Sequence, residues 1–357
     1  MRPVIGGQLS VCGWFMGLRG ILFSLVLAPI FAAAPLAAQT PEQKPFDEWL
    51  VELRSDALKA GISEKTLDAA LADVAPDAAV VKADRNQPEV KLTAESYLGS
   101  RISPQRIAKG REMMEKYRTE LRQVADAFGV QPRFIVAIWG LETNYGGFTG
   151  GRYVIQSLVT LAYDPRRSDF FRKELLAALR ILDEGHVEVP QMTGSWAGAM
   201  GQPQFMPTSF NAYAVDFDGD GRRDIWTTPV DVFASIARYL KSFGWNAEYT
   251  WGREVKIDSE ARKRIADRNL DAPAKSCALR NHRGPLSLKA WQDLGVTRLN
   301  GDPLPDVEIE ASLAMPDGPE GRAFLTYNNY RAILRYNCSD LYAISIGILA
   351  DAFKDLE

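Results

Sequence analysis

A single glutamate stands on the apolar face of a predicted helix, where a carboxylate is unusual. The helix lies within 132–146, and Glu142 follows Ile138 and Trp139 by four and three residues, which places all three on one face. Burial beside these side chains and the negative end of the helix dipole both disfavour the charged form, so we expect a raised pKa for Glu142. A carboxyl group that is protonated near neutral pH can act as a general acid.

The predicted helix has ordinary boundary signals, with Pro132 in its first turn and Asn144 near its end. A structural interpretation of Glu142 is also open, in which the buried glutamate is paired with an arginine such as Arg133 or Arg152. The residues of this stretch do not decide between the two interpretations.

A second segment, 194–210, carries groups suited to binding a sugar. Its three glycines and two alanines allow the backbone to approach a ligand closely, and Trp196 and Phe205 offer aromatic faces for sugar rings. Ser195, Gln202 and Gln204 offer hydrogen bonds. The alternative is a tight helix–helix crossing built on the small residues.

A third segment has the oxygen spacing of a calcium-binding loop. Gly221 supplies the sharp turn at position 6 of that pattern. The loop ligands at positions 1, 3, 5, 7 and 9 would be Asp216, Asp218, Asp220, the Arg222 backbone carbonyl and Asp224. The alternative is a metal-free Asx turn.

The end of the loop departs from the calcium pattern. Position 12 is Thr227, where a bidentate glutamate is expected. Either the site is weaker, or a later carboxylate closes it, and Asp231 in the first turn of the next predicted helix is the candidate. The alternative role of Asp231 is an ordinary capping-box carboxylate serving Thr228.

The composition excludes several classes of protein. The chain has 357 residues, is 46% hydrophobic and 24% charged, and has 42 basic against 45 acidic side chains, which is typical of a globular protein with no basic excess for nucleic acid. Because there is no basic excess, we expect no nucleic-acid partner. Only two histidines are present, so a histidine-rich metal site is excluded.

The first 38 residues predict a secretory signal peptide. They contain Arg2 and Arg19 but no acidic residue, and the uncharged stretch 20–38 is rich in Leu, Ile, Phe and Ala. Its removal, with two arginines and no acids, would change the net charge from −3 to −5. A retained membrane anchor is the alternative, which Pro29, Pro35 and the alanine-rich end disfavour. The expected location is the periplasm, after export by a cleavable signal.

Removal of the signal would leave two cysteines, Cys277 and Cys338. An even pair in an oxidising compartment can form a disulfide. Two separate buried thiols are the alternative, because the sequence gives no distance between them.

The mature chain divides by pattern into four parts. Residues 39–128 predict a helical region, with one long amphipathic stretch over 107–128, and 129–249 hold the densest motifs. Residues 250–322 predict a small β-containing subdomain, with β-prone runs at 254–257 and 307–311 and a turn at Gly284-Pro285. Residues 323–357 end in an apolar helix that should complete the core.

Six motifs follow one another along the mature chain: Glu142-Thr-Asn-Tyr-Gly, Leu161-Ala-Tyr-Asp-Pro-Arg-Arg, Gly194-Ser-Trp-Ala-Gly-Ala-Met-Gly-Gln, Gln204-Phe-Met-Pro, the Asp216 loop and Arg335-Tyr-Asn. Together these motifs resemble the lytic murein transglycosylase B family over most of the mature chain. The resemblance implies an α+β, mainly α fold: a lysozyme-like core with a helical N-terminal region, an EF-hand-type calcium loop and a small β-containing insertion.

The resemblance also implies an activity and a set of site residues. Enzymes of this family cleave the MurNAc-β-1,4-GlcNAc bond of peptidoglycan without water and leave 1,6-anhydro-MurNAc ends, and Glu142 matches their single acid/base. The chemistry would need no cofactor, and Ca²⁺ would be structural. The residues that match substrate-binding positions are Ser195, Gln204, Tyr239, Tyr336, Asn337 and Tyr342, of which the tyrosines on core helices, Tyr239 and Tyr342, are the weaker matches.

The implied partners are peptidoglycan glycan strands and proteins of cell-wall synthesis, and the implied state is a monomer. Two departures from the family pattern stand out: the lipid-attachment cysteine of some members is missing, and one extra residue precedes Asp231. Two other functions remain open. One is a hydrolytic muramidase with Asp164 or Asp169 as a second carboxylate, and the other is a non-catalytic peptidoglycan-binding protein.

Overall fold

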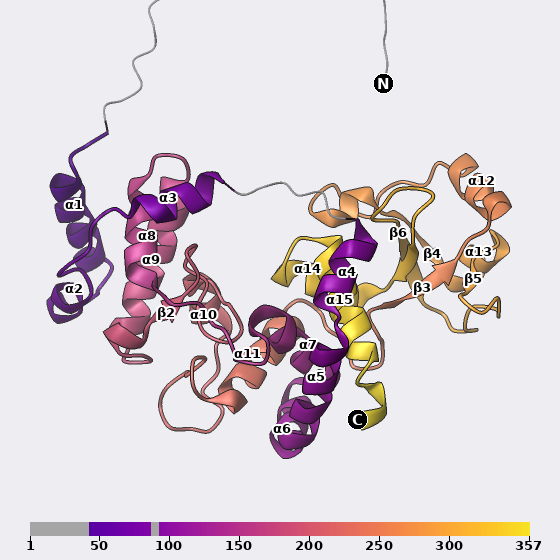
Figure 1. The fold of residues 1–357 in the computed structure, drawn as a ribbon, viewed down its shortest axis with the longest axis horizontal. Coiled ribbons are helices and arrows are strands. Elements are labelled where there is room, and N and C mark those ends of the chain that lie inside the picture. Colours follow the sequence, from indigo (N-terminus) through magenta and orange to yellow (C-terminus); the bar gives the residue numbers. More distant parts are fainter. Residues whose placement is uncertain (1–42, 87–92) are drawn as a thin grey trace, which may run out of the picture. The chain divides into compact units, whose positions relative to one another are not determined.

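The computed structural model describes residues 43–86 and 93–357, and the predicted signal peptide therefore lies outside the described residues. Residues Lys44–Glu357 form one unit by their contacts. Its elements are mostly helices, with a five-stranded antiparallel sheet in one part of the chain and a separate two-stranded pair (Figure 1). The expected mainly helical α+β class is confirmed.

The N-terminal region is helical, as predicted, and polar side chains cap several of its helices. The hydroxyls of Ser63, Thr93 and Ser103 each accept a backbone N–H of the first turn that follows. The amphipathic stretch over 107–128 lies in two helices, because the chain breaks at Tyr117. The helices are α1 (Phe46–Lys59), α2 (Glu64–Ala70), α3 (Ala78–Arg85), α4 (Ala94–Arg101), α5 (Pro104–Lys116) and α6 (Arg118–Phe128).

The centre of the core is α7 (Pro132–Thr143), and every residue of it from 134 to 141 is buried. It packs against α5 and α6 and against two later helices, α11 (Pro229–Ser242) and α15 (Asp340–Asp351). Two further helices, α8 (Val154–Tyr163) and α9 (Ser168–Asp183), pack on each other, and α10 (Pro207–Tyr213) packs on α9. An apolar helix enclosed by four others explains why α7 has no polar face.

The chain turns sharply at the end of α7, as Asn144 and Gly146 predicted. Asn144, Tyr145 and Gly146 all have positive φ angles, of 52°, 61° and 74°. Tyr145 folds back so that its ring covers Gly140, where a Cβ would lie 2.4 Å from the ring. Its hydroxyl donates to the Arg106 carbonyl oxygen at 2.7 Å. The turn therefore fixes the last residues of α7, which include Glu142.

The segment rich in small residues is a loop. Strand β1 (Arg152–Tyr153) pairs with β2 (Thr193–Gly194) after a short 3-10 helix η1 (Val189–Gln191), and isolated bridges join Met200 to Gly194 and Phe205. No helix lies between 194 and 206, so the alternative of a helix–helix crossing is wrong.

The predicted β-containing subdomain has a five-stranded antiparallel sheet of order β4-β6-β7-β3-β5 and its own hydrophobic core around Trp291 and Leu313. The boundary at 322 is wrong, because β7 pairs with both β3 and β6. Its elements are β3 (Gly252–Lys256), α12 (Ser259–Asp267), η2 (Ala278–Asn281), β4 (Arg283–Ser287), α13 (Leu288–Asp293), β5 (Thr297–Arg298), β6 (Glu310–Ala314) and β7 (Ala323–Thr326).

Two local predictions for this subdomain also need correction. The predicted turn at Gly284-Pro285 lies inside β4, where the register against β6 shifts. The run predicted over 307–311 becomes a strand only from Glu310. In both places the pairing partner, which the local pattern does not contain, decides the conformation.

The C-terminal segment returns to the core, as predicted. It consists of α14 (Asn328–Tyr336), α15 and the short helix η3 (Lys354–Leu356). Cys277 and Cys338 form a disulfide, with Cα atoms 5.3 Å apart, so the alternative of separate thiols is wrong.

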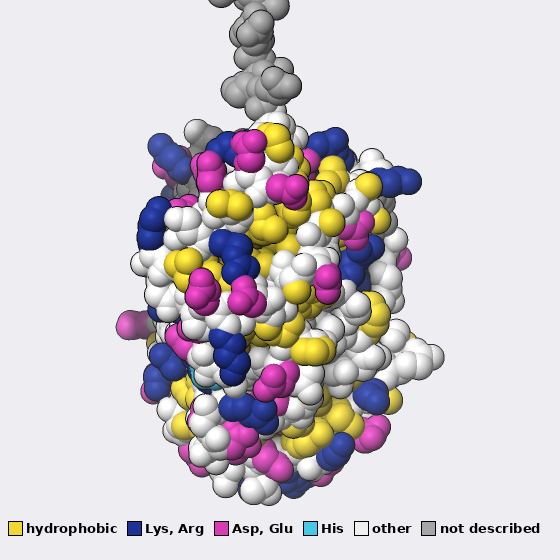
Figure 2. All heavy atoms as spheres, turned by 90° about the vertical axis from the view of Figure 1, so that its left-hand side faces the viewer, with side chains coloured by type: hydrophobic (Ala, Val, Ile, Leu, Met, Phe, Trp, Pro, Cys, Tyr) yellow, Lys and Arg dark blue, Asp and Glu magenta, His cyan; other side chains and the backbone are white. Residues whose placement is uncertain are grey.

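On one face of the molecule, acidic and basic side chains are interspersed around hydrophobic ones (Figure 2). A face of mixed charge does not offer the basic stripe that binds phosphates. Among the described residues, no single helix is long and apolar enough to cross a membrane, although the bent pair α6 and α7 passes the same test of length and composition.

Candidate active site

Glu142 lies half-buried near the C-terminal end of α7. The hydroxyl of Tyr342, from α15, donates to its Oε1 at 2.6 Å. The two residues are 200 positions apart in the chain. Tyr342 is itself buried, with 4% of its surface exposed, so the carboxyl group meets a fixed donor on the protein side.

The environment raises the pKa of Glu142 to about 7. Burial is the main cause, because it disfavours the charged form. The hydrogen bond from Tyr342 and the positive charge of Arg101 act in the opposite direction. The expected raised pKa is therefore present, and the carboxyl group holds its proton over a useful range near neutral pH.

The alternative of a buried ion pair is wrong. Arg133 pairs with Glu357, with Nη1 and Oε2 2.6 Å apart, and Arg152 pairs with Asp77 at 2.8 Å. Both arginines proposed as partners of Glu142 are thus engaged elsewhere, which leaves the carboxyl group with a phenol as its hydrogen-bond donor.

Glu142 lines a pocket of about 290 Å³. The pocket wall is made by two loops, 148–152 and 194–196, which meet closely: a Cβ on Gly150 would lie 2.2 Å from the Gly194 carbonyl oxygen. The other lining residues are Phe148, Gly151, Arg152, Ser195, Trp196 and Gln204.

Ser195, Trp196 and Gln204 all line this pocket, as the sequence predicted. Gln204 has a positive φ of 51° and donates its amide hydrogens to the Thr149 and Gly201 carbonyls at 3.0 and 2.9 Å. The Ser195 hydroxyl accepts the Ala199 N–H at 3.0 Å, so its own proton remains for donation.

Phe148 is a pocket residue that the sequence did not predict. Its side chain is 76% exposed and lines the pocket beside Trp196. A large aromatic side chain left in solvent is a signal that only the structure reveals, because burial of a loop residue does not follow a periodic pattern.

Three of the predicted substrate-binding residues, Tyr239, Tyr336 and Asn337, are not among the residues that line the pocket. Tyr336 donates its hydroxyl to the Pro203 carbonyl and Tyr239 to the Arg335 carbonyl, both at 2.6 Å, and their rings lie 4.8 Å apart. Asn337 is exposed at the end of α14. The Tyr336 hydroxyl therefore holds the backbone next to Gln204, whereas the Tyr239 hydroxyl holds the end of α14.

Two further expectations about the 194–210 segment are wrong. Phe205 is only 2% exposed and packs on Tyr239 and Tyr336, so it offers no face to a sugar. Gln202 is internal, since its Oε1 accepts the Trp139 indole N–H at 2.7 Å and its amide donates to Trp226.

The acidic loop gathers part of the predicted ligand set. Asp216, Asp218 and Asp231 each bring a carboxylate oxygen within 4.8 Å of the other two. Asp231 accepts the backbone N–H groups of Phe217 and Asp224 at 2.8 and 2.9 Å. It closes the loop instead of capping Thr228, so the capping-box alternative is wrong.

Other predicted ligands point elsewhere. Both carboxylate oxygens of Asp224 are engaged by residues that follow it, including the backbone N–H of Trp226 and the hydroxyl of Thr227. Asp220 Oδ2 lies 3.7 Å from the guanidinium of Arg222. These two carboxylates are therefore outside the cluster formed by Asp216, Asp218 and Asp231.

Like charges crowd Asp231. Burial raises its pKa to about 6, and the charges of Asp218 and Asp216 act in the same direction. A cation among the three carboxylates would remove this repulsion. A set of hard oxygen donors in a loop with the calcium spacing fits Ca²⁺.

A mainly helical core with one carboxyl group in the lining of a pocket is the arrangement of the lysozyme-like fold class. The chain belongs to the family described as Transglycosylase SLT domain, whose profile matches residues 45–351.

Three relatives illustrate the similarity. Membrane-bound lytic murein transglycosylase B of Escherichia coli K12 is 32% identical over 252 residues, which are 70% of this chain and 64% of that protein. The structure of SltB3 from Pseudomonas aeruginosa with NAG-anhNAM-pentapeptide has 44% identity and a TM-score of 0.80, over 87% of this chain and 80% of that one. Escherichia coli Slt35 in complex with calcium has 28% identity and a TM-score of 0.69, over 87% and 93%.

Proposed function

We propose that this protein is a peptidoglycan lytic transglycosylase that cleaves the MurNAc-β-1,4-GlcNAc bond without water and leaves a 1,6-anhydro-MurNAc end. The observation that carries the proposal is a single carboxyl group, Glu142, with a pKa of about 7 in the lining of a pocket of about 290 Å³. The names of the relatives support the substrate: the curated one is a murein transglycosylase, and SltB3 was solved with NAG-anhNAM-pentapeptide.

The reaction needs one group that gives and then takes a proton. Protonated Glu142 donates to the glycosidic oxygen as its bond to C1 of MurNAc breaks. The resulting carboxylate then removes the proton of the C6 hydroxyl, whose oxygen forms the new bond to C1. Glu142 ends protonated as it began, and no water enters. Tyr342 stabilises the carboxylate between the two steps through its hydrogen bond.

The pocket favours this reaction over hydrolysis. Hydrolytic glycosidases use a second carboxylate opposite the acid, but Glu142 is the sole acidic residue among the described residues that line the pocket. Asp164, one residue considered for the second role, pairs with Arg85 at 2.7 Å and also accepts the Arg166 N–H. The substrate's own C6 hydroxyl then remains as the nucleophile.

Digestion of purified sacculi tests the proposal. A transglycosylase releases muropeptides that are lighter by one water than the corresponding hydrolysis products, and mass spectrometry separates the two. Products of hydrolytic mass would indicate a muramidase, and no release at all would indicate a binding protein.

Glu142→Gln should abolish release while the protein still binds sacculi. The environment already favours an uncharged carboxyl group, so a neutral amide of the same size should be accommodated without unfolding. We expect a fall of at least ~10²-fold in kcat from loss of the acid/base. Pull-down with sacculi is the matched measurement, and full lysis by the variant would refute the mechanism.

We also propose a structural Ca²⁺ in the acidic loop, held by Asp216, Asp218 and Asp231, with no cofactor in the reaction itself. Two observations support it: the three carboxylates converge, and Slt35 was solved in complex with calcium. The ion would tie the loop to the start of α11, where Asp231 lies.

The substrate places the enzyme in the cell envelope, and we propose the periplasm. The disulfide supports an oxidising compartment. Export by cleavage near residue 38 is tested by N-terminal sequencing of the mature protein. A chain that retains the first 38 residues would instead indicate a membrane anchor, consistent with the name of the curated relative. Monomeric state and association with proteins of cell-wall synthesis remain predictions.

A further inference from the structure

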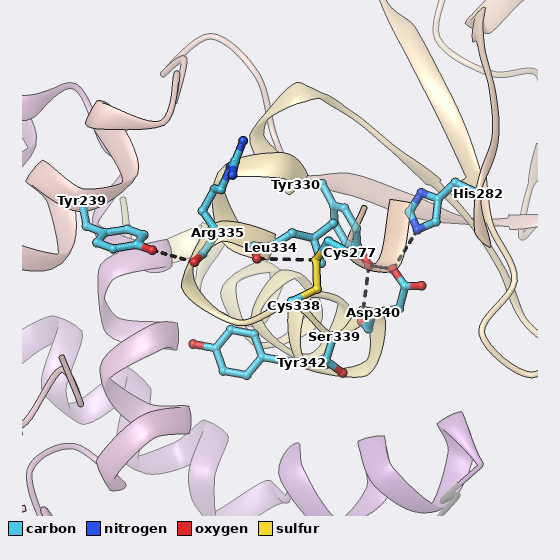
Figure 3. Close-up of a disulfide and its surroundings, with 10 residues drawn as sticks. All are labelled: Tyr239, Cys277, His282, Tyr330, Leu334, Arg335, Cys338, Ser339, Asp340 and Tyr342. Atoms are coloured by element: carbon cyan, nitrogen blue, oxygen red, sulfur yellow. Dashed lines mark hydrogen bonds and ion pairs between the residues drawn. A yellow bond between two sulfur atoms is a disulfide. The ribbon is translucent and has the colours of Figure 1, made fainter. Parts of the chain in front are cut away.

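The start of α15 is attached to the 277–282 segment at two neighbouring positions. Cys338, just before the helix, is disulfide-bonded to Cys277. Two residues later, Asp340 Oδ1 lies 2.7 Å from His282 Nε2. Figure 3 shows both attachments gathered around the first turn of the helix. One short piece of the β-containing subdomain therefore fixes a helix end that belongs to the core.

The second attachment is buried and has a further partner. His282 is fully buried, and the hydroxyl of Tyr330 donates to the same Asp340 oxygen at 2.7 Å. The two rings lie 5.7 Å apart. Loss of one member would leave polar groups unsatisfied in the interior, so this contact resists local movement.

The helix that starts here carries the donor to the acid. Ser339 lies between the two attachments and caps α15, since its Oγ accepts the Tyr342 N–H at 3.4 Å. The Tyr342 hydroxyl in turn donates to Glu142 at 2.6 Å. A displacement of the helix start thus moves the phenol directly, and a short charge-assisted hydrogen bond tolerates little displacement.

Other groups that face Glu142 lie on α4 and α14. The 277–282 segment also contacts α14, because Cys277 Sγ lies 3.9 Å from the Leu334 carbonyl oxygen, but the disulfide and the His282–Asp340 contact join it to the start of α15. Arg101 on α4 lowers the pKa of Glu142 through its charge, and Tyr336 on α14 has a raised pKa partly because of the Glu142 charge. Among the described residues, Tyr342 is the hydrogen-bond donor to the Glu142 side chain. No residue of the 277–282 segment lines the pocket.

We propose that the 277–282 segment is a positioning element for the catalytic acid. Through the Cys277–Cys338 disulfide and the His282–Asp340 contact, it holds Tyr342 against Glu142. The proposal rests on the function proposed above only for its effect on turnover, because the hydrogen bond itself can be measured without substrate.

Loosening the attachments should change how Glu142 titrates. The Tyr342 hydroxyl stabilises the carboxylate, so its withdrawal raises the pKa of Glu142. The alkaline limb of the kcat/KM profile, where the acid loses its proton, then moves to higher pH. Tyr342→Phe, which removes the donor completely, should move it upward by about one pH unit.

The experiment follows the Glu142 carboxyl carbon by ¹³C NMR titration, assigned by its absence in Glu142→Gln, together with the kcat/KM profile. We expect Cys277→Ser/Cys338→Ser and Asp340→Ala to raise the pKa of Glu142 in the direction of Tyr342→Phe. Leu53→Ala, in the distant helix α1, is the control: it removes a fully buried side chain and should lower the melting temperature without moving the titration.

The decisive comparison is made in the Tyr342→Phe background. If the attachments act through Tyr342, removing the disulfide there moves the titration no further. The proposal would be overturned if the pKa of Glu142 in the disulfide variant equals that of the wild type. It would also be overturned if removal of the disulfide raises this pKa further in the Tyr342→Phe background. If a variant does not fold, reduction of the wild-type disulfide, whose Cys338 is exposed, provides the same comparison. Failure of sacculus lysis would count against the proposed function alone, since the titration needs no substrate.

Discussion

At the scale of single residues, Glu142 combines two properties that oppose each other. Burial favours the protonated acid, whereas Tyr342 and Arg101 favour the carboxylate. A group that must first donate and then accept a proton needs both states within reach, and a pKa of about 7 provides this near neutral pH. A second carboxylate would upset the balance by raising the pKa further.

The activity should therefore decline with rising pH. The protonated fraction of Glu142 falls as the pH passes through about 7, so kcat/KM should drop roughly tenfold per pH unit well above that value. Turnover of soluble muropeptide oligomers between pH 5 and 9 measures this limb. A profile that stays level beyond pH 8 would show that the acid is not the group identified here.

Phe148 should contribute to substrate binding and little to stability. Its side chain lines the pocket and is 76% exposed, and the loss of an exposed side chain changes the free energy of unfolding by about 0.5 kcal/mol or less. We expect Phe148→Ala to raise KM several-fold at an unchanged melting temperature. Phe170→Ala, in α9, is the matched control, because that phenylalanine is 49% exposed and lies outside the pocket lining; equal kinetic effects in both would contradict the assignment.

At the scale of elements, sequence reasoning succeeded where the signal is local. The run 134–141 is apolar throughout and leads directly into Glu142, and this predicted both a buried helix and its anomalous acid. The calcium spacing predicted the acidic loop, and the missing ligand at Thr227 led to Asp231, which the structure does bring to Asp216 and Asp218. Each of these inferences needed only neighbours within about 16 residues in the chain.

The failures concern contacts between distant segments. Tyr342 was one of the weaker matches because a tyrosine on an apolar helix is usually packing, yet it is the residue bonded to Glu142. Tyr239 has the same local pattern and donates to a backbone carbonyl instead. Nothing in either local sequence distinguishes the two, since the difference lies in which helix faces each hydroxyl.

The acidic loop yields a prediction about metal removal. Chelation should lower the melting temperature, because a free Ca²⁺ concentration of 100 times the Kd stabilises the folded state by about 2.7 kcal/mol. Differential scanning fluorimetry with and without EGTA measures the change, with re-addition of Ca²⁺ as the reversal. Asp231→Asn should remove most of the response, whereas Asp220→Asn, outside the cluster of three, should retain more of it. A melting temperature that changes neither with EGTA nor with added Ca²⁺ would exclude the site.

At the scale of the whole molecule, the β-containing subdomain has a hydrophobic core separate from that of the helices. The central strand of its sheet is β7, which leads directly into α14 and α15. The chain therefore leaves the helical core after α11 and returns to it at α14. This insertion was predicted from its turns and short strands, but its end was placed too early because β7 is recognisable only by its partners β3 and β6.

The disulfide should contribute substantially to overall stability. It joins residues that are 61 positions apart, and a cross-link over that length reduces the entropy of the unfolded chain by an amount worth about 4 kcal/mol. We expect Cys277→Ser/Cys338→Ser to unfold at markedly lower urea concentration than the wild type, with a larger m-value because its unfolded chain is less compact. Equal midpoints under oxidising conditions would show that the cross-link is not formed in solution.

The separation of 200 residues between Glu142 and Tyr342 has a consequence for the order in which the enzyme becomes competent. A chain synthesised from its N-terminus presents Glu142 long before the last helix exists. The acid acquires its hydrogen-bond donor only when α15 has been made and has docked on α7. The proposed active site is thus incomplete until the final turns of the chain arrive.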